Sequence, residues 1–140
     1  MIAVDTNILV YAHRRDSEFH DAARDVVAGL AQGQGAWAVP WPCIHELLAI
    51  VTHARIYDPP STTAEAVEQV DAWTESPSLV LIGESIGHWS TLRSLVLAGR
   101  IRGPVIHDAR VAAICKSQGV RELWSADRDF SRFAELNVRN

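Results

Sequence analysis

Five acidic residues of this 140-residue chain lie beside or within apolar segments, where isolated charges are uncommon. Asp5 directly follows the apolar run MIAV, and Asp127 and Asp129 follow the run ELWS. Glu46 lies within CIHELLAIV, and Asp108 lies within VIHDARVAAIC. Carboxylate oxygens are the ligands that hard divalent cations such as Mg²⁺ and Mn²⁺ prefer. If the fold brings these acids together, they predict a site for such a cation.

A cluster of carboxylates is unstable without a counter-charge. Two like charges about 4 Å apart cost about 4 kcal/mol at an effective dielectric constant near 20. A zinc site is a poorer explanation, because the chain has no His or Cys cluster. His45 and Glu46 begin like the zinc motif HExxH, but Ala49 stands where its second His belongs and the next histidine is His53. The sequence therefore favours Mg²⁺ or Mn²⁺ and argues against a zinc protease.

Each acid taken alone also has a structural explanation. Asp5 and Asp108 can cap the helices that follow them, since Asp is favoured near helix N-termini. Glu46 can pair with Arg55, and the two aspartates after ELWS can be ordinary turn residues. The prediction of a metal site depends on the acids occurring as a set.

The elements that must position these acids alternate between strands and helices. We predict strands at 2–4, 36–40, 79–82 and 122–125, and helices at 6–14, 17–33, 42–57, 63–73, 86–99 and 105–119. Such alternation predicts an α/β fold with a mostly parallel sheet that is covered on both faces. Reactive groups in such folds gather beyond the carboxyl ends of the strands, where Asp5 and Asp127 lie.

Length and composition set further limits. A chain of 140 residues with 48% hydrophobic content is expected to form one domain, residues 1–140. The formal net charge of −4 argues against a generic nucleic-acid binder. Cys43 and Cys115 lie far apart in the sequence and are expected to be reduced, packed thiols. No membrane segment or leader is evident, so we expect a cytoplasmic protein.

In order and spacing, these motifs resemble those of the PIN-domain ribonucleases. In size and layout the chain is similar to the VapC-type toxins of bacterial toxin–antitoxin pairs. The likeness spans nearly the whole chain and is carried by VDTNILVY, HELL, HDARVAA and SADRDFSRF. It implies a three-layer α/β/α sandwich, a homodimer, and a cognate antitoxin whose C-terminal segment blocks the acidic pocket.

The resemblance also implies roles for individual residues. The expected metal ligands are Asp5, Asp108, Asp127 and Asp129, of which the family uses the last less uniformly. Glu46 is expected to complete the cage or to orient water. The residues expected to orient the carboxylates or to contact phosphate are Thr6, Asn7, Ser125 and Arg128. Ser125 stands where many family members carry Thr, and it keeps the hydroxyl group.

The function that we expect is hydrolysis of RNA phosphodiester bonds by water activated at Mg²⁺ or Mn²⁺. The cation would offset the negative charge of the pocket. Arginines can supply a rim that contacts phosphate, although a solvated surface is the ordinary role for most of them. These arginines are Arg14, Arg15, Arg100, Arg102, Arg110, Arg128 and Arg132.

Two other functions are compatible with parts of the sequence. A catalytically silent PIN-like domain could serve as a scaffold for RNA or protein, but an intact set of acids argues against it. Phosphatases with a nucleophilic aspartate require a second aspartate where Asn7 stands. Trp41 and Trp89 are candidates for exposure. Trp89 shares one side of the helix at 86–99 with Leu92, Leu95 and Val96, which favours core packing over a partner-binding groove.

Overall fold

The centre of the molecule is a parallel sheet, and the computed structural model describes residues 1–127, 130, 133 and 136–139. The strands run in the order β3-β2-β1-β4-β5, and every described pair is parallel. Their bounds are Ile2–Val4 for β1, Trp37–Pro40 for β2, Leu79–Ile82 for β3, Glu122–Trp124 for β4 and Val138–Arg139 for β5. This arrangement confirms the predicted α/β fold.

The central strand, β1, has strands on both sides and is largely buried. Ala3 is paired with Ala38 of β2 and with Leu123 of β4, and all three side chains are fully buried. Strands that are buried on both faces read as continuous apolar runs, which explains the sequences IAV and WAVP.

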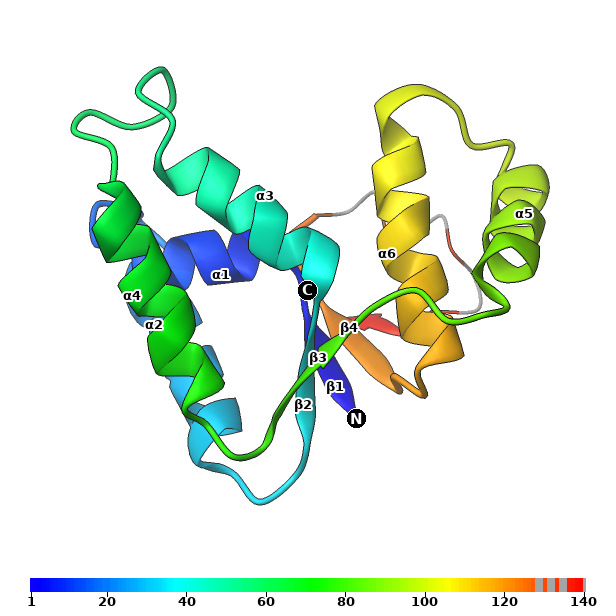
Figure 1. Ribbon diagram of the computed structural model, residues 1–140, viewed down its shortest axis with the longest axis horizontal. Helices are drawn as coiled ribbons and strands as arrows, with labels where there is room; N and C mark the ends of the chain where they lie inside the picture. Colours follow the sequence, from blue (N-terminus) through cyan, green and yellow to red (C-terminus); the bar gives the residue numbers. More distant parts are fainter. Residues whose placement is uncertain (128–129, 131–132, 134–135, 140) are drawn as a thin grey trace.

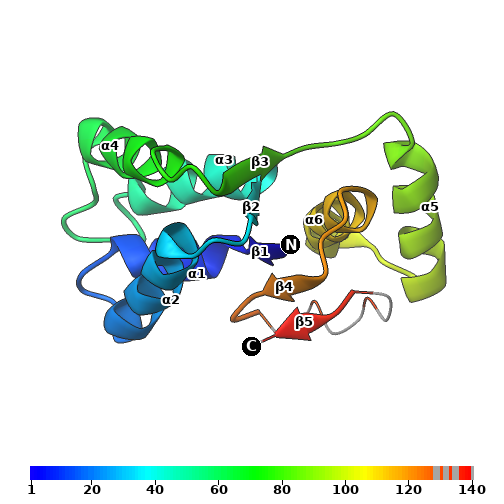
Figure 2. The same ribbon diagram turned by 90° about the horizontal axis from the view of Figure 1, so that it is seen from below.

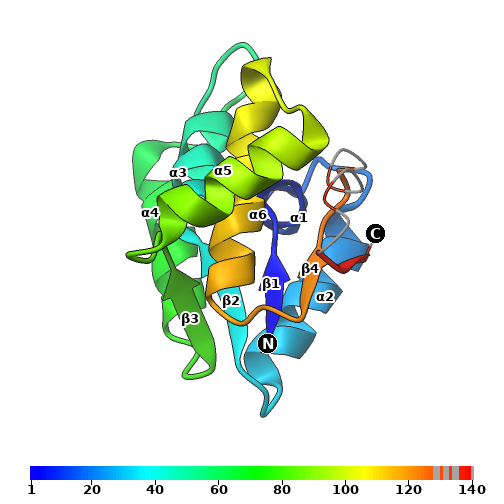
Figure 3. The same cartoon turned by 90° about the vertical axis from the view of Figure 1, so that its right-hand side faces the viewer.

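Helices cover both faces of the sheet. In the described residues these are α1 (Thr6–His13), α2 (His20–Gln32), α3 (Trp41–Val51), α4 (Thr63–Thr74), α5 (His88–Gly99) and α6 (Ile106–Ser117). Figures 1 and 2 show α1 to α4 on one side of the strands and α5 and α6 on the other. Figure 3 looks onto this second layer, with α5 outermost. The predicted three-layer α/β/α sandwich is confirmed. No helix in the described part is long and apolar enough to cross a membrane.

The hydrophobic core joins the sheet to both helical layers. Trp37 of β2 is the largest fully buried side chain. Leu9 and Leu47 contribute from the layer of α1 to α4, and Ile114 contributes from α6. The segments that follow β1 and β4 therefore begin at strands that are packed into the core.

The end of α3 differs from the prediction. The helix was expected to continue to residue 57, but it ends at Val51. Thr52 Oγ1 donates to the carbonyl oxygen of Leu48 at 2.7 Å, and the Ser61 N–H donates to the carbonyl oxygen of Val51 at 2.8 Å. The returning chain thus satisfies the end of the helix. Residues 53–56 are exposed, so continuing the helix would have buried little apolar surface.

Two smaller differences concern an added strand and a late helix start. The two-residue strand β5 was not predicted, because so short a segment carries no periodic signal. The helix expected at 17–33 begins at His20, since the His20 N–H donates to the carbonyl oxygen of Ser17 in a turn that precedes it.

Both cysteines are free and fully buried, as expected. Burial raises the pKa of Cys43, and it raises the pKa of Cys115 to about 12. The thiolate is the reactive form, so at pH 8 we expect Cys115 of the native protein to react with Ellman's reagent about a thousandfold more slowly than an ordinary thiol. Both thiols should react within minutes in guanidinium chloride. Rapid labelling of the native protein would contradict this packing.

Candidate active site

Four of the five predicted acids line one pocket. The cavity has a volume of about 230 Å³, and its acidic residues are Asp5, Glu46, Asp108 and Asp127. They come from the end of β1, from α3, from the first turn of α6 and from the segment after β4. The pocket lies beyond the carboxyl ends of β1 and β4, where the parallel sheet was expected to gather reactive groups. Asp129 and Arg128 lie outside the described residues.

Asp5 is the most deeply buried of these acids, with 6% of its surface exposed. Ser125 Oγ donates a hydrogen bond to its Oδ2 at 2.7 Å, and the Cys43 thiol lies 3.6 Å from its Oδ1. Burial raises the pKa of Asp5, and the charge of Glu46 adds to the effect. Asp5 occupies the N-cap position of α1, and a hydrogen bond from the Thr6 backbone partly offsets the rise in its pKa, but its side chain forms no capping hydrogen bond in the described chain.

Ser125 connects two of the acids. It is fully buried, its Oγ donates to Asp5, and the same Oγ accepts a hydrogen bond from the Asp127 N–H at 2.9 Å. Asn7 Oδ1 accepts from the Ala126 N–H at 3.1 Å, which ties the same turn to the start of α1. The bonds of Ser125 to Asp5 and of Ala126 to Asn7 link residues 120 and 119 positions apart and set the segment carrying Asp127 against Asp5.

Glu46 lies on the exposed side of α3, although it stands within an apolar segment of the sequence. The buried face of this helix is formed by Cys43, Ile44, Leu47 and Val51, and Glu46 is exposed at the pocket. Its Oε2 accepts a hydrogen bond from Thr6 Oγ1 at 3.2 Å, so its partner is Thr6 and not Arg55. Thr6 therefore orients this carboxylate from the first turn of α1.

Asp108 is half-buried in the first turn of α6 and faces the pocket. The positive end of the helix dipole favours an acid in this turn, so a structural role near the helix N-terminus and a place in the pocket are compatible for Asp108.

The donor chemistry of the pocket fits a hard cation. Its acids offer oxygen ligands only, and the buried Asp5 carboxylate is already held by Ser125. Within the described part of the chain, no three His, Cys, Asp or Glu side chains are placed to hold one metal ion together. The carboxylates are thus gathered but spaced more widely than a closed coordination shell, and a bound cation would have to draw them together.

Two tyrosines of the pocket were not anticipated. Tyr11 and Tyr57 line the cavity together with Val10, Ile50 and Val111. Tyr11 lies in α1, and helical spacing from Asn7 could have predicted that it faces the same side of the helix. Tyr57 carried no usable signal, because the sequence placed it at the end of a helix and the structure places it in a loop.

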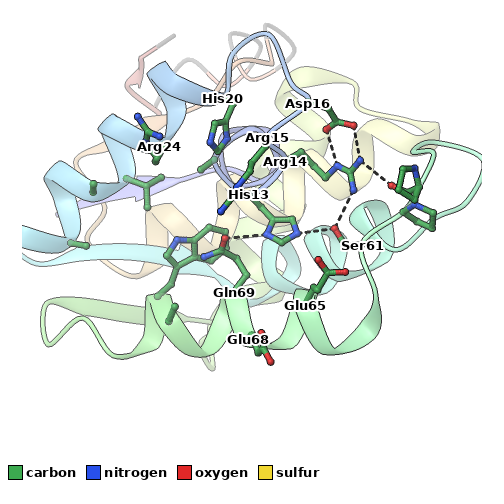
Figure 4. Close-up of a pocket in the computed structure, with 18 of the residues that line it drawn as sticks. His13, Arg14, Arg15, Asp16, His20, Arg24, Ser61, Glu65, Glu68 and Gln69 are labelled. Carbon is green, nitrogen blue, oxygen red and sulfur yellow. Dashed lines mark hydrogen bonds and ion pairs between the residues drawn. The ribbon is translucent and has the colours of Figure 1, made fainter.

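A second cavity, of about 1350 Å³, lies between α2 and α4 (Figure 4). His13 crosses it, with Nδ1 3.0 Å from Gln69 Oε1 and Nε2 2.8 Å from Ser61 Oγ. Arg14 forms an ion pair with Asp16 at 2.6 Å. The residues that line it include Arg14, Arg15 and Arg24 as well as Asp16, Glu65 and Glu68 (Figure 4), so this cavity is not a uniformly basic groove.

The predicted arginine rim is only partly available. Arg14 is bound to Asp16, and Arg110 forms an ion pair with Glu84 at 2.6 Å. Arg15, Arg100 and Arg102 are exposed, and Arg128 and Arg132 lie outside the described residues. Arg14 and Arg110 are therefore engaged in ion pairs within the protein.

Comparison with known proteins connects this pocket to a family. Residues 2–136 match the family model of the PIN domain. Ribonuclease VapC48 of Mycobacterium tuberculosis is 32% identical over 136 residues, which cover 97% of this chain and 94% of that protein. Ribonuclease VapC31 of the same organism is 33% identical over 136 residues, with 97% and 95% covered.

Solved structures share the fold at lower sequence identity. VapC20 of Mycobacterium tuberculosis, a toxin described as cleaving the sarcin-ricin loop, has a TM-score of 0.70 at 15% identity, with 94% of this chain and 93% of that chain covered. VapBC2 of Rickettsia felis, solved with a DNA fragment, has a TM-score of 0.73 at 19% identity, with 100% and 98% covered. With the acidic pocket in place and the PIN model matching nearly every residue, this chain belongs to the PIN-domain family.

Proposed function

We propose that this protein is an endoribonuclease that hydrolyses RNA phosphodiester bonds with Mg²⁺ or Mn²⁺, and that it is the toxin of a toxin–antitoxin pair. The observation that carries the proposal is the convergence of Asp5, Glu46, Asp108 and Asp127 on one pocket. The names of the relatives, VapC ribonucleases at 32% and 33% identity, support the same reaction.

In this proposal the cation is held by Asp5, Asp108 and Asp127, with Asp129 as a further ligand. A divalent cation bound there lowers the pKa of water and offsets negative charge on the reacting phosphate. Ser125 holds Asp5 and the Asp127 backbone in register, and Thr6 holds Glu46 where it can orient water. Such partners of ligands fix the direction in which the carboxylates point.

The direct test maps new RNA ends in total RNA after induced expression of the protein, compared with an Asp5→Asn variant. New ends that depend on Asp5 are the expected result. An absence of new ends would favour the alternative, a catalytically silent scaffold.

Binding of the metal alone separates the same two functions. Isothermal titration with Mn²⁺ should show binding to the wild-type protein that is lost in Asp108→Asn. A scaffold has no need of the ion, so an absence of binding at millimolar Mn²⁺ would count against the nuclease.

The proposed partner is a cognate antitoxin whose C-terminal segment blocks the acidic pocket. One structural neighbour is a VapBC assembly, which supports a partner of this kind. We expect the purified pair to cleave no RNA and the isolated protein to cleave it. A small open reading frame immediately upstream would identify the candidate.

We also propose a homodimer, for which the outer face of α5 is the candidate surface. Trp89, a candidate for exposure, is 69% exposed there and Leu97 is 60% exposed, although the side of the helix that Trp89 shares with Leu95 had favoured core packing. Leu95, on the other side of the helix, is buried, which explains why α5 docks on α6 through a different face. Sedimentation equilibrium should give twice the chain mass of 15.4 kDa.

A further inference from the structure

Tyr57 forms part of the wall of the carboxylate pocket, although none of the proposed metal or proton roles requires it. It lies in the loop between α3 and α4, and its backbone N–H donates to the carbonyl oxygen of His53 at 3.1 Å. The side chain is half-buried, so part of it remains accessible beside the acids. An uncharged aromatic surface in a negatively charged pocket offers a contact that charge repulsion does not weaken.

Arg14 holds this ring in place. Its guanidinium carbon lies 4.1 Å from the centroid of the Tyr57 ring, a cation–π contact that covers one face of the ring. Nε and Nη2 of Arg14 donate to the two carboxylate oxygens of Asp16, at 2.9 and 2.6 Å. Nη2 also donates to the carbonyl oxygen of Pro59 at 3.0 Å, and the Arg14 side chain is only 11% exposed.

The loop that carries Tyr57 is held at its far end as well. Ser61 is buried, and its Oγ accepts a hydrogen bond from Arg14 Nη1 at 3.3 Å and lies 2.8 Å from His13 Nε2. The Ser61 N–H is bound to the end of α3. The ring therefore needs little ordering when a ligand arrives, and contacts made by a preorganised group cost less entropy on binding.

We propose that Tyr57 binds the RNA nucleotide next to the scissile phosphate by stacking on its base, and that Arg14 is the positioning residue that holds the ring. This inference rests on the proposed ribonuclease function. Proteins that recognise single-stranded RNA stack its bases on aromatic side chains, and such contacts tolerate any base. Burial raises the pKa of Tyr57, which keeps its hydroxyl neutral beside the acids.

Binding can be measured apart from cleavage. The probe is a fluorescein-labelled 12-nucleotide single-stranded RNA of mixed sequence, and the background is Asp108→Asn so that the RNA stays intact. Tyr57→Leu should raise the dissociation constant roughly 10-fold or more, since stacking on one base has an effect of that order. Tyr57→Phe and Tyr57→Trp should stay within about twofold of the parent, because both keep an aromatic ring.

The matched control is Ile56→Ala. Ile56 is the neighbour of Tyr57 on the same loop, it is 53% exposed, and it does not line the pocket. Its truncation should leave affinity unchanged. If Tyr57→Trp binds RNA as weakly as Tyr57→Leu, the residue acts through packing and the inference is overturned.

The role of Arg14 is tested in the protein with all acids intact. Arg14→Gln should raise KM for RNA severalfold and leave kcat nearly unchanged, because the ring loses its support but the acids do not move. Arg14→Lys should not restore KM, since Lys lacks the planar fork that binds Asp16 in a bidentate manner. An equal fall in kcat would overturn the positioning role.

Failure of this inference differs from failure of the proposed function. A wild-type protein that neither binds nor cleaves RNA overturns both. A wild-type protein that cleaves RNA, together with a Tyr57→Leu variant of unchanged affinity, overturns the inference alone. Circular dichroism shows whether Tyr57→Leu is folded. If it is not, the affinities of Tyr57→Phe and Tyr57→Trp for RNA still test the inference.

Discussion

We expect Asp5→Asn and Asp108→Asn each to abolish Mg²⁺-dependent RNA cleavage while the fold stays intact. Each substitution removes a charged ligand from the pocket that both residues line. The loss should exceed the roughly 100-fold effect that is typical when only a partner of a ligand is removed. The measurement is the rate of cleavage of a labelled RNA in Mg²⁺, with folding checked by circular dichroism.

Asp5→Asn should also lose its activity without a loss of thermal stability. Burial, with a smaller contribution from Glu46, raises the pKa of Asp5. At any pH above that pKa the ionised carboxylate therefore lowers the stability of the metal-free fold. Asn has no charge to desolvate, so the melting temperature of Asp5→Asn in EDTA should equal or exceed that of the wild type.

The control for both is Asp71→Asn. This substitution makes the same chemical change on the exposed surface of α4, away from the pocket, and should leave cleavage unchanged. Turnover retained in Asp5→Asn or Asp108→Asn would contradict the assignment of these acids. A large fall in melting temperature would mean that the ionised Asp5 and its hydrogen bond from Ser125 stabilise the fold more than burial of the charge destabilises it.

The second prediction with a large effect concerns Ser125. Ser125→Ala should lower kcat/KM by roughly 10- to 100-fold and weaken Mn²⁺ binding by a similar factor. One hydroxyl donates to Asp5 and accepts from the Asp127 N–H, so its removal loosens the Asp5 carboxylate and the Asp127 backbone at once. The buried Asp5 and the half-buried Asp127 backbone each lose a hydrogen bond, which should lower the free energy of unfolding by about 1–3 kcal/mol.

Ser125→Thr separates the hydroxyl from the space that the residue fills. It keeps the oxygen and adds one methyl group, so most of the activity and of the Mn²⁺ affinity should remain. Should Ser125→Ala keep full Mn²⁺ affinity, the hydroxyl would not orient the ligands. Should Ser125→Thr lose as much as Ser125→Ala, tight packing at this fully buried position would explain both results.

Much of the fold follows from local patterns in the sequence. The strands IAV and LVLI and the amphipathic helix α4 lie where apolar periodicity predicts them, and Thr62 is the cap of α4. The Thr62 and Glu65 side chains form the reciprocal bonds of a capping box. These signals survive in the structure because they depend on residues that are close in the chain.

The extent of α3 was not predictable in this way. Its apolar pattern runs beyond Val51, but Ser61 returns to bond the end of the helix there. A contact between residues ten positions apart, in a loop without periodicity, decides where the helix stops. The position of Tyr57 follows from the same contact.

The sequence alone determined the alternation of strands and helices and the four acids that line the pocket, because those acids lie at strand ends or on particular helix turns. The resemblance named Ser125 and Thr6 as residues that orient carboxylates, but only the tertiary structure decided which acid each of them holds. Ser125 meets Asp5 across 120 positions, and Thr6 meets Glu46 across 40. Such bonds depend on the order of the strands and the docking of α3, and periodicity along the chain predicts neither.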